Sequence, residues 1–234
     1  MAAMVSLQGA ELTLDPSGAA WWAERATLLL ADISLGEGAS TAQGGRLLPP
    51  HNARATIGRL ALVLRRYRPD RVVALGERFA DGEAAPRLAA EDAALLERLV
   101  SEREWIWIDD ERDSAPPPRF GGTRSAALAL DPLILRHRPA AGYAAGEVCG
   151  HFHPKAAVRV RGRRISGRCF VTDGARLVLP AFGSHAGGLD ALDPAISELF
   201  EGQVRVYLIG REAIYLFAAE RLEGLRRSEP AAAR

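Results

Sequence analysis

Two of the five histidines in this 234-residue chain, His151 and His153, are separated by a single residue in the stretch VCGHFHP. In extended or turn backbone, residues i and i+2 point to the same side, so the two imidazoles can converge on one point. Gly150 allows an unusual dihedral before the pair, and Pro154 stops strand pairing after it. Neutral imidazoles placed this way are typical metal ligands; the alternative is an ordinary surface turn with two histidines.

The elements that would position this pair can be predicted from hydrophobic patterns. Short apolar runs at 26–32, 71–76 and 104–109 predict buried strands. Between them, 52–70 and 88–102 carry apolar side chains at helical spacing. The first half therefore alternates strand and helix, which indicates a mostly parallel sheet with crossover helices.

The second half has a different pattern. Eight short runs between 125 and 219 are separated by Gly, Asp-Pro or Asp-Gly, which predicts mainly antiparallel strands with one short helix at 193–200. An α+β sandwich of two mixed sheets flanked by helices accommodates both halves around one core. We therefore expect a single domain over 1–225 and a disordered tail at 226–234.

Composition limits the function classes. A net charge of +1 argues against a strongly basic nucleic-acid clamp, and 48% hydrophobic residues indicate a packed globular core. Two cysteines make no disulfide framework, so a reducing cytoplasm is the expected location, and Cys149 is expected to be a small buried hydrophobe. We find no signal-peptide pattern and no apolar run long enough to span a membrane.

Several motifs occur in the order of a known superfamily. They are ADISLGEGAS, ALGERFAD, WIDDERD, LILRHRP and GHFHP, followed by two longer stretches, RGRRISGRCFV and LPAFGSHAGGLDALDPAI. Over about residues 20–218 the chain resembles the calcineurin-like metallophosphoesterases, and more narrowly the PdeM-type ligase-associated DNA damage response endonucleases. The resemblance implies an αββα sandwich and a hydrolase that cleaves phosphodiesters, DNA among them.

The chemistry implied by this resemblance uses two divalent cations about 3.5–4 Å apart, which clamp the attacking and leaving oxygens at phosphorus. Carried over position by position, the resemblance implies metal ligands at Asp32, Glu77, Glu111, His137, His151 and His153. It also places Arg112 where the family has its helper histidine, and Asp113 at the last aspartate of that motif.

Several of these positions depart from the family pattern. Ser34 stands where a ligand histidine is expected. Glu77 replaces the bridging aspartate, and its extra methylene shifts the carboxylate by about 1.5 Å, far beyond the roughly 0.2 Å tolerance of a coordination sphere. Glu111 replaces an asparagine, and Arg112 could either contact a phosphate or pair with a carboxylate in place of a cation.

These departures predict an eroded centre that holds one tightly bound Mn²⁺, Zn²⁺ or Fe²⁺ at most, or no metal, with weak or lost phosphodiesterase activity. The alternative is an active phosphodiesterase or DNA endonuclease that uses a modified or mononuclear site. His185 is expected to be a solvated loop residue rather than a substitute ligand.

Partners follow partly from charge and partly from the resemblance. The arginines Arg159, Arg161, Arg163, Arg164 and Arg168 could form a stripe that holds a nucleic-acid backbone. A solvated strand face explains the same residues without a ligand. Association with a DNA ligase and a helicase-like protein in DNA repair is implied by the resemblance alone.

Overall fold

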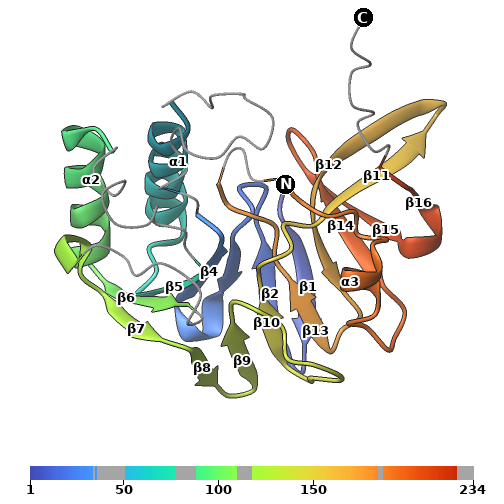
Figure 1. The fold of residues 1–234 in the computed structure, drawn as a ribbon, viewed down its shortest axis with the longest axis horizontal. Helices are drawn as coiled ribbons and strands as arrows, with labels where there is room; N and C mark the ends of the chain where they lie inside the picture. Colours follow the sequence, from blue (N-terminus) through green and yellow to red (C-terminus); the bar gives the residue numbers. More distant parts are fainter. Residues whose placement is uncertain (34, 36–50, 77–87, 110–117, 184–186, 226–234) are drawn as a thin grey trace, which may run out of the picture.

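A computed structural model of the chain describes residues 1–33, 35, 51–76, 88–109, 118–183 and 187–225. Two β-sheets lie face to face, with helices α1 and α2 covering the outer side of the first sheet and a short α3 beside the second (Figure 1). The prediction of an α+β sandwich with two mixed sheets flanked by helices is confirmed.

The first sheet has seven strands that lie in sequence order. They are β1 (Ala3–Leu7), β2 (Ala10–Leu14), β3 (Ala20–Trp22), β4 (Thr27–Ala31), β5 (Arg71–Leu75), β6 (Glu104–Ile108) and β7 (Thr123–Ser125). The first four strands are antiparallel neighbours, whereas β4 to β7 are parallel. Because both faces of the parallel part are covered, every residue of the TLLLA run in β4 is buried.

Helices α1 (His51–Tyr67) and α2 (Ala90–Ser101) form the crossovers predicted between these parallel strands. Their apolar faces pack on the outer side of β4, β5 and β6 in one buried cluster. Helix α1 ends at Tyr67 because Arg68 adopts a left-handed conformation, with φ at 47°, and Pro69 cannot continue a helix.

The second sheet has nine strands. They are β8 (Ala127–Leu130), β9 (Leu133–Arg136), β10 (Glu147–Cys149), β11 (Lys155–Val160), β12 (Arg163–Thr172), β13 (Arg176–Val178), β14 (Arg205–Ile209), β15 (Ile214–Ala218) and β16 (Leu222–Glu223). Most neighbours are antiparallel, as predicted, but β10 pairs in parallel with both β9 and β13. This parallel part brings the carboxyl ends of β9 and β10 side by side.

The helical segments described besides α1 and α2 are short. Helix α3 (Pro194–Ser197) is shorter than the predicted 193–200, although Asp193 caps it by accepting a hydrogen bond from Ala195 N at 3.0 Å. Single 3-10 turns lie at Ala23–Arg25, Pro118–Phe120 and Ala219–Arg221. None of the helices described is long and apolar enough to cross a bilayer.

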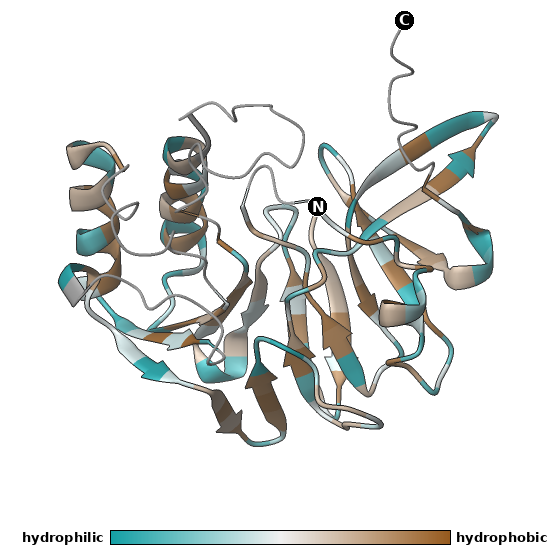
Figure 2. Cartoon of the chain, in the orientation of Figure 1, coloured by the Kyte–Doolittle hydropathy of each residue, from teal (hydrophilic) through white to brown (hydrophobic). Residues whose placement is uncertain are grey.

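The layers are held together by three apolar clusters. The largest lies between the two sheets and joins residues such as Leu29 and Leu75 to Leu135, Val148 and Leu177. Figure 2 shows the same arrangement, with hydrophobic residues concentrated on the strands and hydrophilic residues toward the end of the β11–β12 hairpin. The inner cluster fixes the two sheets against each other, and with them the carboxyl ends of β4, β5, β9 and β10.

Candidate metal centre

Asp32 follows the last residue of β4 at the carboxyl end of the parallel strands. Its backbone N–H donates to Leu75 O at 3.1 Å, and its carbonyl accepts from Gly183 N at 3.0 Å. The φ angle of Asp32 is 48°, a left-handed conformation that aspartate tolerates better than most residues. The residue is only 7% exposed, so the fold holds a carboxylate in a buried position with a strained backbone.

Three of the sequence-predicted histidines meet this carboxylate. The Oδ1 atom lies 3.0 Å from His137 Nε2 and 3.2 Å from His153 Nε2. The Oδ2 atom accepts a hydrogen bond from the backbone N–H of His151 at 2.9 Å. Burial raises the pKa of Asp32, but the hydrogen bonds and charges of His137 and His153 outweigh it, so the pKa lies well below its usual value.

Two glycines make room for this arrangement. A Cβ atom on Gly76, which directly follows β5, would lie 2.2 Å from His137 Cδ2. A Cβ atom on Gly150 would lie 2.8 Å from Ala31 Cβ and 2.9 Å from Asp32 Oδ2. Gly76 also has a φ angle of 80°, so its lack of a side chain serves both the turn and the histidine ring beside it.

His151 has a second polar partner that the motifs did not indicate. Its Nε2 atom lies 2.9 Å from the guanidinium NH1 of Arg138. Because a guanidinium can only donate, Nε2 must accept, which places the ring proton on Nδ1. Burial, and then the charge of Arg138, lower the pKa of His151 to about 4, so this imidazole is neutral at pH 7. Its ring also contacts those of His137 and Phe152, with centroids 5.3 and 5.0 Å away.

These donors can be compared with a metal coordination sphere. Ligands about 2.1 Å from a divalent ion stand roughly 3.0–3.4 Å from their neighbours in the sphere. Asp32 Oδ1 has that separation from His137 Nε2 and from His153 Nε2. However, no group of three His, Cys, Asp or Glu side chains in the described ranges could hold an ion by itself. The described residues are of types that bind metals, and pairs of their donor atoms have suitable separations, but they do not complete a coordination sphere.

The remaining predicted site residues lie outside the described part of the chain. They are Ser34, Glu77, Glu111, Arg112, Asp113 and His185. Their predicted roles as ligands, helper or solvated loop residue stay predictions.

Arg138 is the site residue that the sequence reasoning missed. The signal lies in strand register rather than in a motif. Arg136 of β9 is paired with Cys149 of β10, and the next step of the ladder is the hydrogen bond from Gly150 N to His137 O, 3.0 Å long. One residue further along both strands, Arg138 meets His151. Only knowledge that β9 and β10 are parallel neighbours would have paired these residues.

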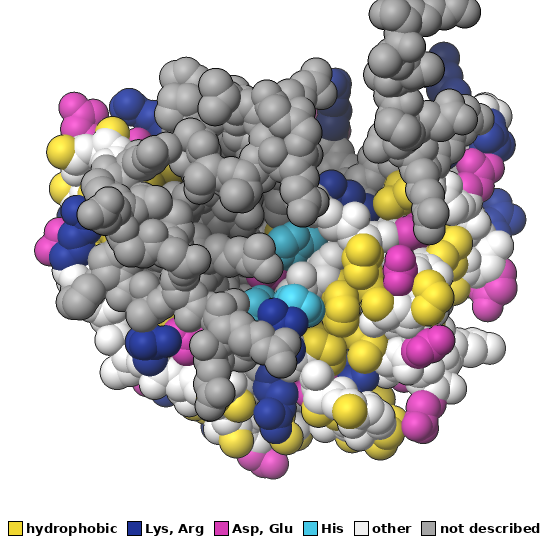
Figure 3. Space-filling model, in the orientation of Figure 1, with side chains coloured by type: hydrophobic (Ala, Val, Ile, Leu, Met, Phe, Trp, Pro, Cys, Tyr) yellow, Lys and Arg dark blue, Asp and Glu magenta, His cyan; other side chains and the backbone are white. Residues whose placement is uncertain are grey.

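Figure 3 shows this region at the surface, where histidine side chains lie beside basic ones and next to an apolar patch. Cys149, immediately before Gly150, is fully buried, as predicted for a small apolar side chain. Burial raises the pKa of its thiol far above the usual range, so Cys149 is not a reactive thiolate.

The five arginines predicted as a stripe do not share one surface. Arg168 is turned inward, where it donates to the carbonyls of Ala181 and Ser17. The sequence predicted Arg168 in an exposed stripe, but its side chain instead anchors the segment that follows β13. The other four lie on the β11–β12 hairpin, where Arg159 and Arg164 both pair with Glu223, at 2.7 and 3.7 Å.

Two facing sheets with helices outside them form the sandwich, and a buried aspartate and three histidines lie together at the ends of its parallel strands. Among solved structures, the nuclease MPE of Pseudomonas putida matches this chain with a TM-score of 0.69 and 23% sequence identity. The match covers 93% of this chain and 100% of the nuclease chain. At that identity the likeness concerns the fold alone. No family model matches the sequence, and no curated protein matches it.

Proposed function

We propose that the chain is a PdeM-like metallophosphoesterase homologue with an eroded metal centre. It binds one Mn²⁺, Zn²⁺ or Fe²⁺ at most, and its hydrolysis of phosphodiesters is weak or lost. The observation that carries this proposal is that the atoms expected to bind metal already contact one another or a guanidinium. Asp32 Oδ1 is shared by two imidazoles at 3.0 and 3.2 Å, and the ligand nitrogen of His151 contacts Arg138.

A single ion would lie on the side of Asp32 that faces His137 and His153. When bound, a divalent ion polarises a phosphoryl oxygen and lowers the pKa of a bound water. The chain's own contribution is to keep Asp32 ionised and to fix its orientation through the backbone N–H of His151. The two-ion clamp of the family chemistry would need further ligands, and Ser34 and Glu77 are poorly suited to supply them.

An active phosphodiesterase with a modified or mononuclear site is the second candidate. The observation that favours it is that Asp32, His137, His151 and His153 still converge, although they come from three separate segments, which follow β4, β9 and β10, in two sheets. Gly76 and Gly150 leave space for this convergence. A site with no remaining chemistry has no need of that space.

Hydrolysis of bis-p-nitrophenyl phosphate and of single-stranded and double-stranded DNA, with Mn²⁺ or Zn²⁺ added, distinguishes the two candidates. The eroded centre predicts turnover close to that of the protein-free blank, and no further loss in His153→Ala. Clear metal-dependent turnover that disappears in His153→Ala would instead establish the active mononuclear candidate. The matched control is His51→Ala, which changes a histidine of another segment.

DNA contact through the β11–β12 hairpin belongs to the same proposal. Arg159, Arg161 and Arg163 are exposed on this hairpin, and Glu223 pairs with Arg159 beside it. We expect Arg161→Ala with Arg163→Ala to weaken binding of single-stranded DNA in EDTA and to lower its salt dependence. Equal binding by the variant and the parent protein would remove the hairpin from the proposal. The DNA-repair setting, the ligase and helicase-like partners and the cytoplasmic location have support from the resemblance and composition alone.

A further inference from the structure

The contact between Arg138 and His151 is built into the sheet. Strands β9 and β10 are parallel neighbours, with Arg136 opposite Cys149. The hydrogen bond from Gly150 N to His137 O continues that pairing beyond the strand ends. Arg138 and His151 are the next residues on each side, and their side chains meet at 2.9 Å. The register of the sheet therefore delivers a guanidinium to this imidazole.

The contact uses the atom that a metal would need. The lone pair of Nε2 on a neutral imidazole can accept a hydrogen bond or bind a cation, but it cannot do both. A metal about 2.1 Å from this nitrogen would overlap the guanidinium NH1 at 2.9 Å. The charge of arginine is permanent, so the guanidinium also repels a divalent ion at this position.

The other two histidines differ from His151 in this respect. His137 and His153 both direct Nε2 at the same oxygen of Asp32. The backbone N–H of His151 donates to Asp32, and its side chain turns to Arg138. The cluster thus has two sides. On one, Asp32 and the imidazoles of His137 and His153 could bind an ion; on the other, the imidazole of His151 already contacts the cationic guanidinium of Arg138.

We propose that Arg138 is an internal cation that occupies the metal-binding nitrogen of His151 and so excludes an ion from that side of the centre. The inference rests on the proposed function and adds the residue that limits the centre to one ion. Arg138 is a positioning residue here, because it acts through His151. Removing the guanidinium frees a ligand nitrogen, so the centre should then hold more metal.

Zinc binding to the full chain tests this directly. Equilibrium dialysis against Zn²⁺ should show one bound equivalent at most in the parent protein and about one more in Arg138→Ala. Adding His151→Ala to that variant should cancel the gain. Arg136→Ala is the matched control, because it removes a nearby guanidinium that contacts Glu147 and not His151. Arg136 Nε lies 3.5 Å from Glu147 Oε1. It should leave the count unchanged.

Nitrogen NMR of histidine in the parent protein gives a second measurement that needs no variant. Without metal, His151 should be neutral, with the proton on Nδ1 and Nε2 as acceptor. Saturating Zn²⁺ should shift the Nε2 signals of His137 or His153 and leave that of His151 in place. Arg138→Met, which keeps the length of the side chain without the charge or a donor, replaces Arg138→Ala if the alanine variant does not fold.

Each result decides between the proposals. If folded Arg138→Ala or Arg138→Met binds no more zinc than the parent protein, or if zinc shifts His151 Nε2 in the parent, the role given to Arg138 is wrong. Those results leave the one-ion proposal intact as long as the parent protein holds one equivalent or fewer. Two equivalents in the parent protein would instead overturn the proposed function itself.

Discussion

At the scale of single residues, the arrangement of Asp32 and His137 depends on two glycines, Gly76 and Gly150, that leave space for these side chains. His137 occupies the space above Gly76, and Asp32 Oδ2 lies close to Gly150. The strained φ angles of 48° at Asp32 and 74° at His151 are held by backbone hydrogen bonds rather than by the histidine contacts alone. A methyl group added at either glycine should therefore displace the histidine or aspartate side chain beside it.

We predict that Gly76→Ala displaces His137 and lowers stability by more than about 1 kcal/mol, since a left-handed backbone alone costs an alanine about that much. Urea denaturation and zinc binding measure the two effects. The control is Gly58→Ala in α1, where a Cβ would meet nothing within 4 Å. That change should raise stability by about 0.5–1 kcal/mol. Unchanged zinc binding in Gly76→Ala would contradict the predicted displacement.

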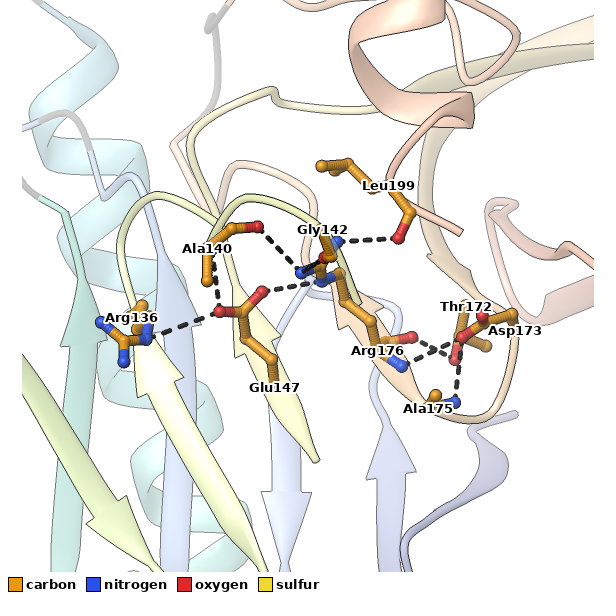
Figure 4. Close-up of polar contacts among 9 residues, drawn as sticks. All are labelled: Arg136, Ala140, Gly142, Glu147, Thr172, Asp173, Ala175, Arg176 and Leu199. Carbon is orange, nitrogen blue, oxygen red and sulfur yellow. Dashed lines mark hydrogen bonds and ion pairs between the residues drawn. The ribbon is translucent and has the colours of Figure 1, made fainter. Parts of the chain in front are cut away.

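At the scale of elements, a buried ion pair positions the start of β10. Arg176 Nε and Glu147 Oε2 lie 2.7 Å apart, and both side chains are almost fully buried. Arg176 also donates to the carbonyls of Ala140, Gly142 and Leu199, while Glu147 accepts from Ala140 N (Figure 4). The pair thus fixes the loop between β9 and β10, the two strands that deliver His137 and His151.

We predict that Glu147→Gln lowers the free energy of unfolding by about 3–5 kcal/mol, because it leaves a buried guanidinium without its counter-charge. Chemical denaturation measures the change. Glu102→Gln provides the matched control, because the Glu102 side chain is half exposed where it pairs with Arg98 at 3.9 Å and with Arg103 at 3.0 Å. Its effect should stay within about 0.5 kcal/mol. Similar losses in the two variants would mean that the buried pair has no special role.

A second carboxylate ties α1 to the first sheet. Asp15 Oδ2 lies 2.7 Å from Arg66 NH1 and accepts from Tyr67 Oη at 2.8 Å, and Oδ1 accepts from Ser17 N at 2.8 Å. Burial raises the pKa of Asp15, but the hydrogen bonds outweigh it, so the pKa of the folded state lies below its usual value. The resulting stabilisation is present above the unfolded pKa of about 3.9 and is lost as pH falls through the folded pKa.

Asp15→Asn should therefore cost most stability at neutral pH, and the difference from the parent protein should shrink as pH falls below about 4. Urea midpoints at pH 7, 5 and 3.5 measure this trend. A difference that stays constant or grows toward acid pH would show that Asp15 is not held ionised by these contacts. Asp193→Asn, at an exposed helix cap, is the control for the general effect of replacing an aspartate by asparagine.

At the scale of the whole molecule, one inner layer joins the two sheets. Leu29 of β4 and Leu177 of β13 are both fully buried in it. We propose on this basis that residues 1–225 form a single domain. A shared core makes the stability of each half depend on the other, so the two sheets should unfold together.

Leu29→Ala and Leu177→Ala should each lower stability by about 2–5 kcal/mol and keep a single unfolding transition. Tryptophan fluorescence reports mainly on the first sheet, where all four tryptophans lie, and far-UV circular dichroism reports on both sheets. The transitions from the two probes should coincide in both variants. A variant whose fluorescence and dichroism transitions separate would contradict the single domain.

How far the sequence predicts this molecule differs between elements. The buried runs of β4, β5 and β6 and the periodicity of α1 and α2 give their bounds within a few residues. The hairpin of β1 and β2 was not predicted. Its two-residue turn at Gln8 and Gly9, with φ angles of 50° and 87°, is of the type in which both residues are left-handed. In the sequence, Gly9 is a weak indication of this turn, because Gln8 is not a typical turn residue.

The centre was predictable where its residues fall into motifs. Asp32, His137, His151 and His153 were all named from the sequence, and the structure brings them together. Arg138 was not, because its contact with His151 depends on which strands are neighbours. Arg168 was placed on an exposed stripe because alternation along a strand does not reveal which arginine turns toward the carbonyls of another segment.

The most direct measurement of the central claim is anomalous scattering from crystals grown with manganese, which counts the ions and locates each one. The account predicts one ion at most, bound on the side of Asp32 that faces His137 and His153, with Arg138 still in contact with His151. Two well-ordered ions in the centre, one of them bound to His151 Nε2, would contradict the account.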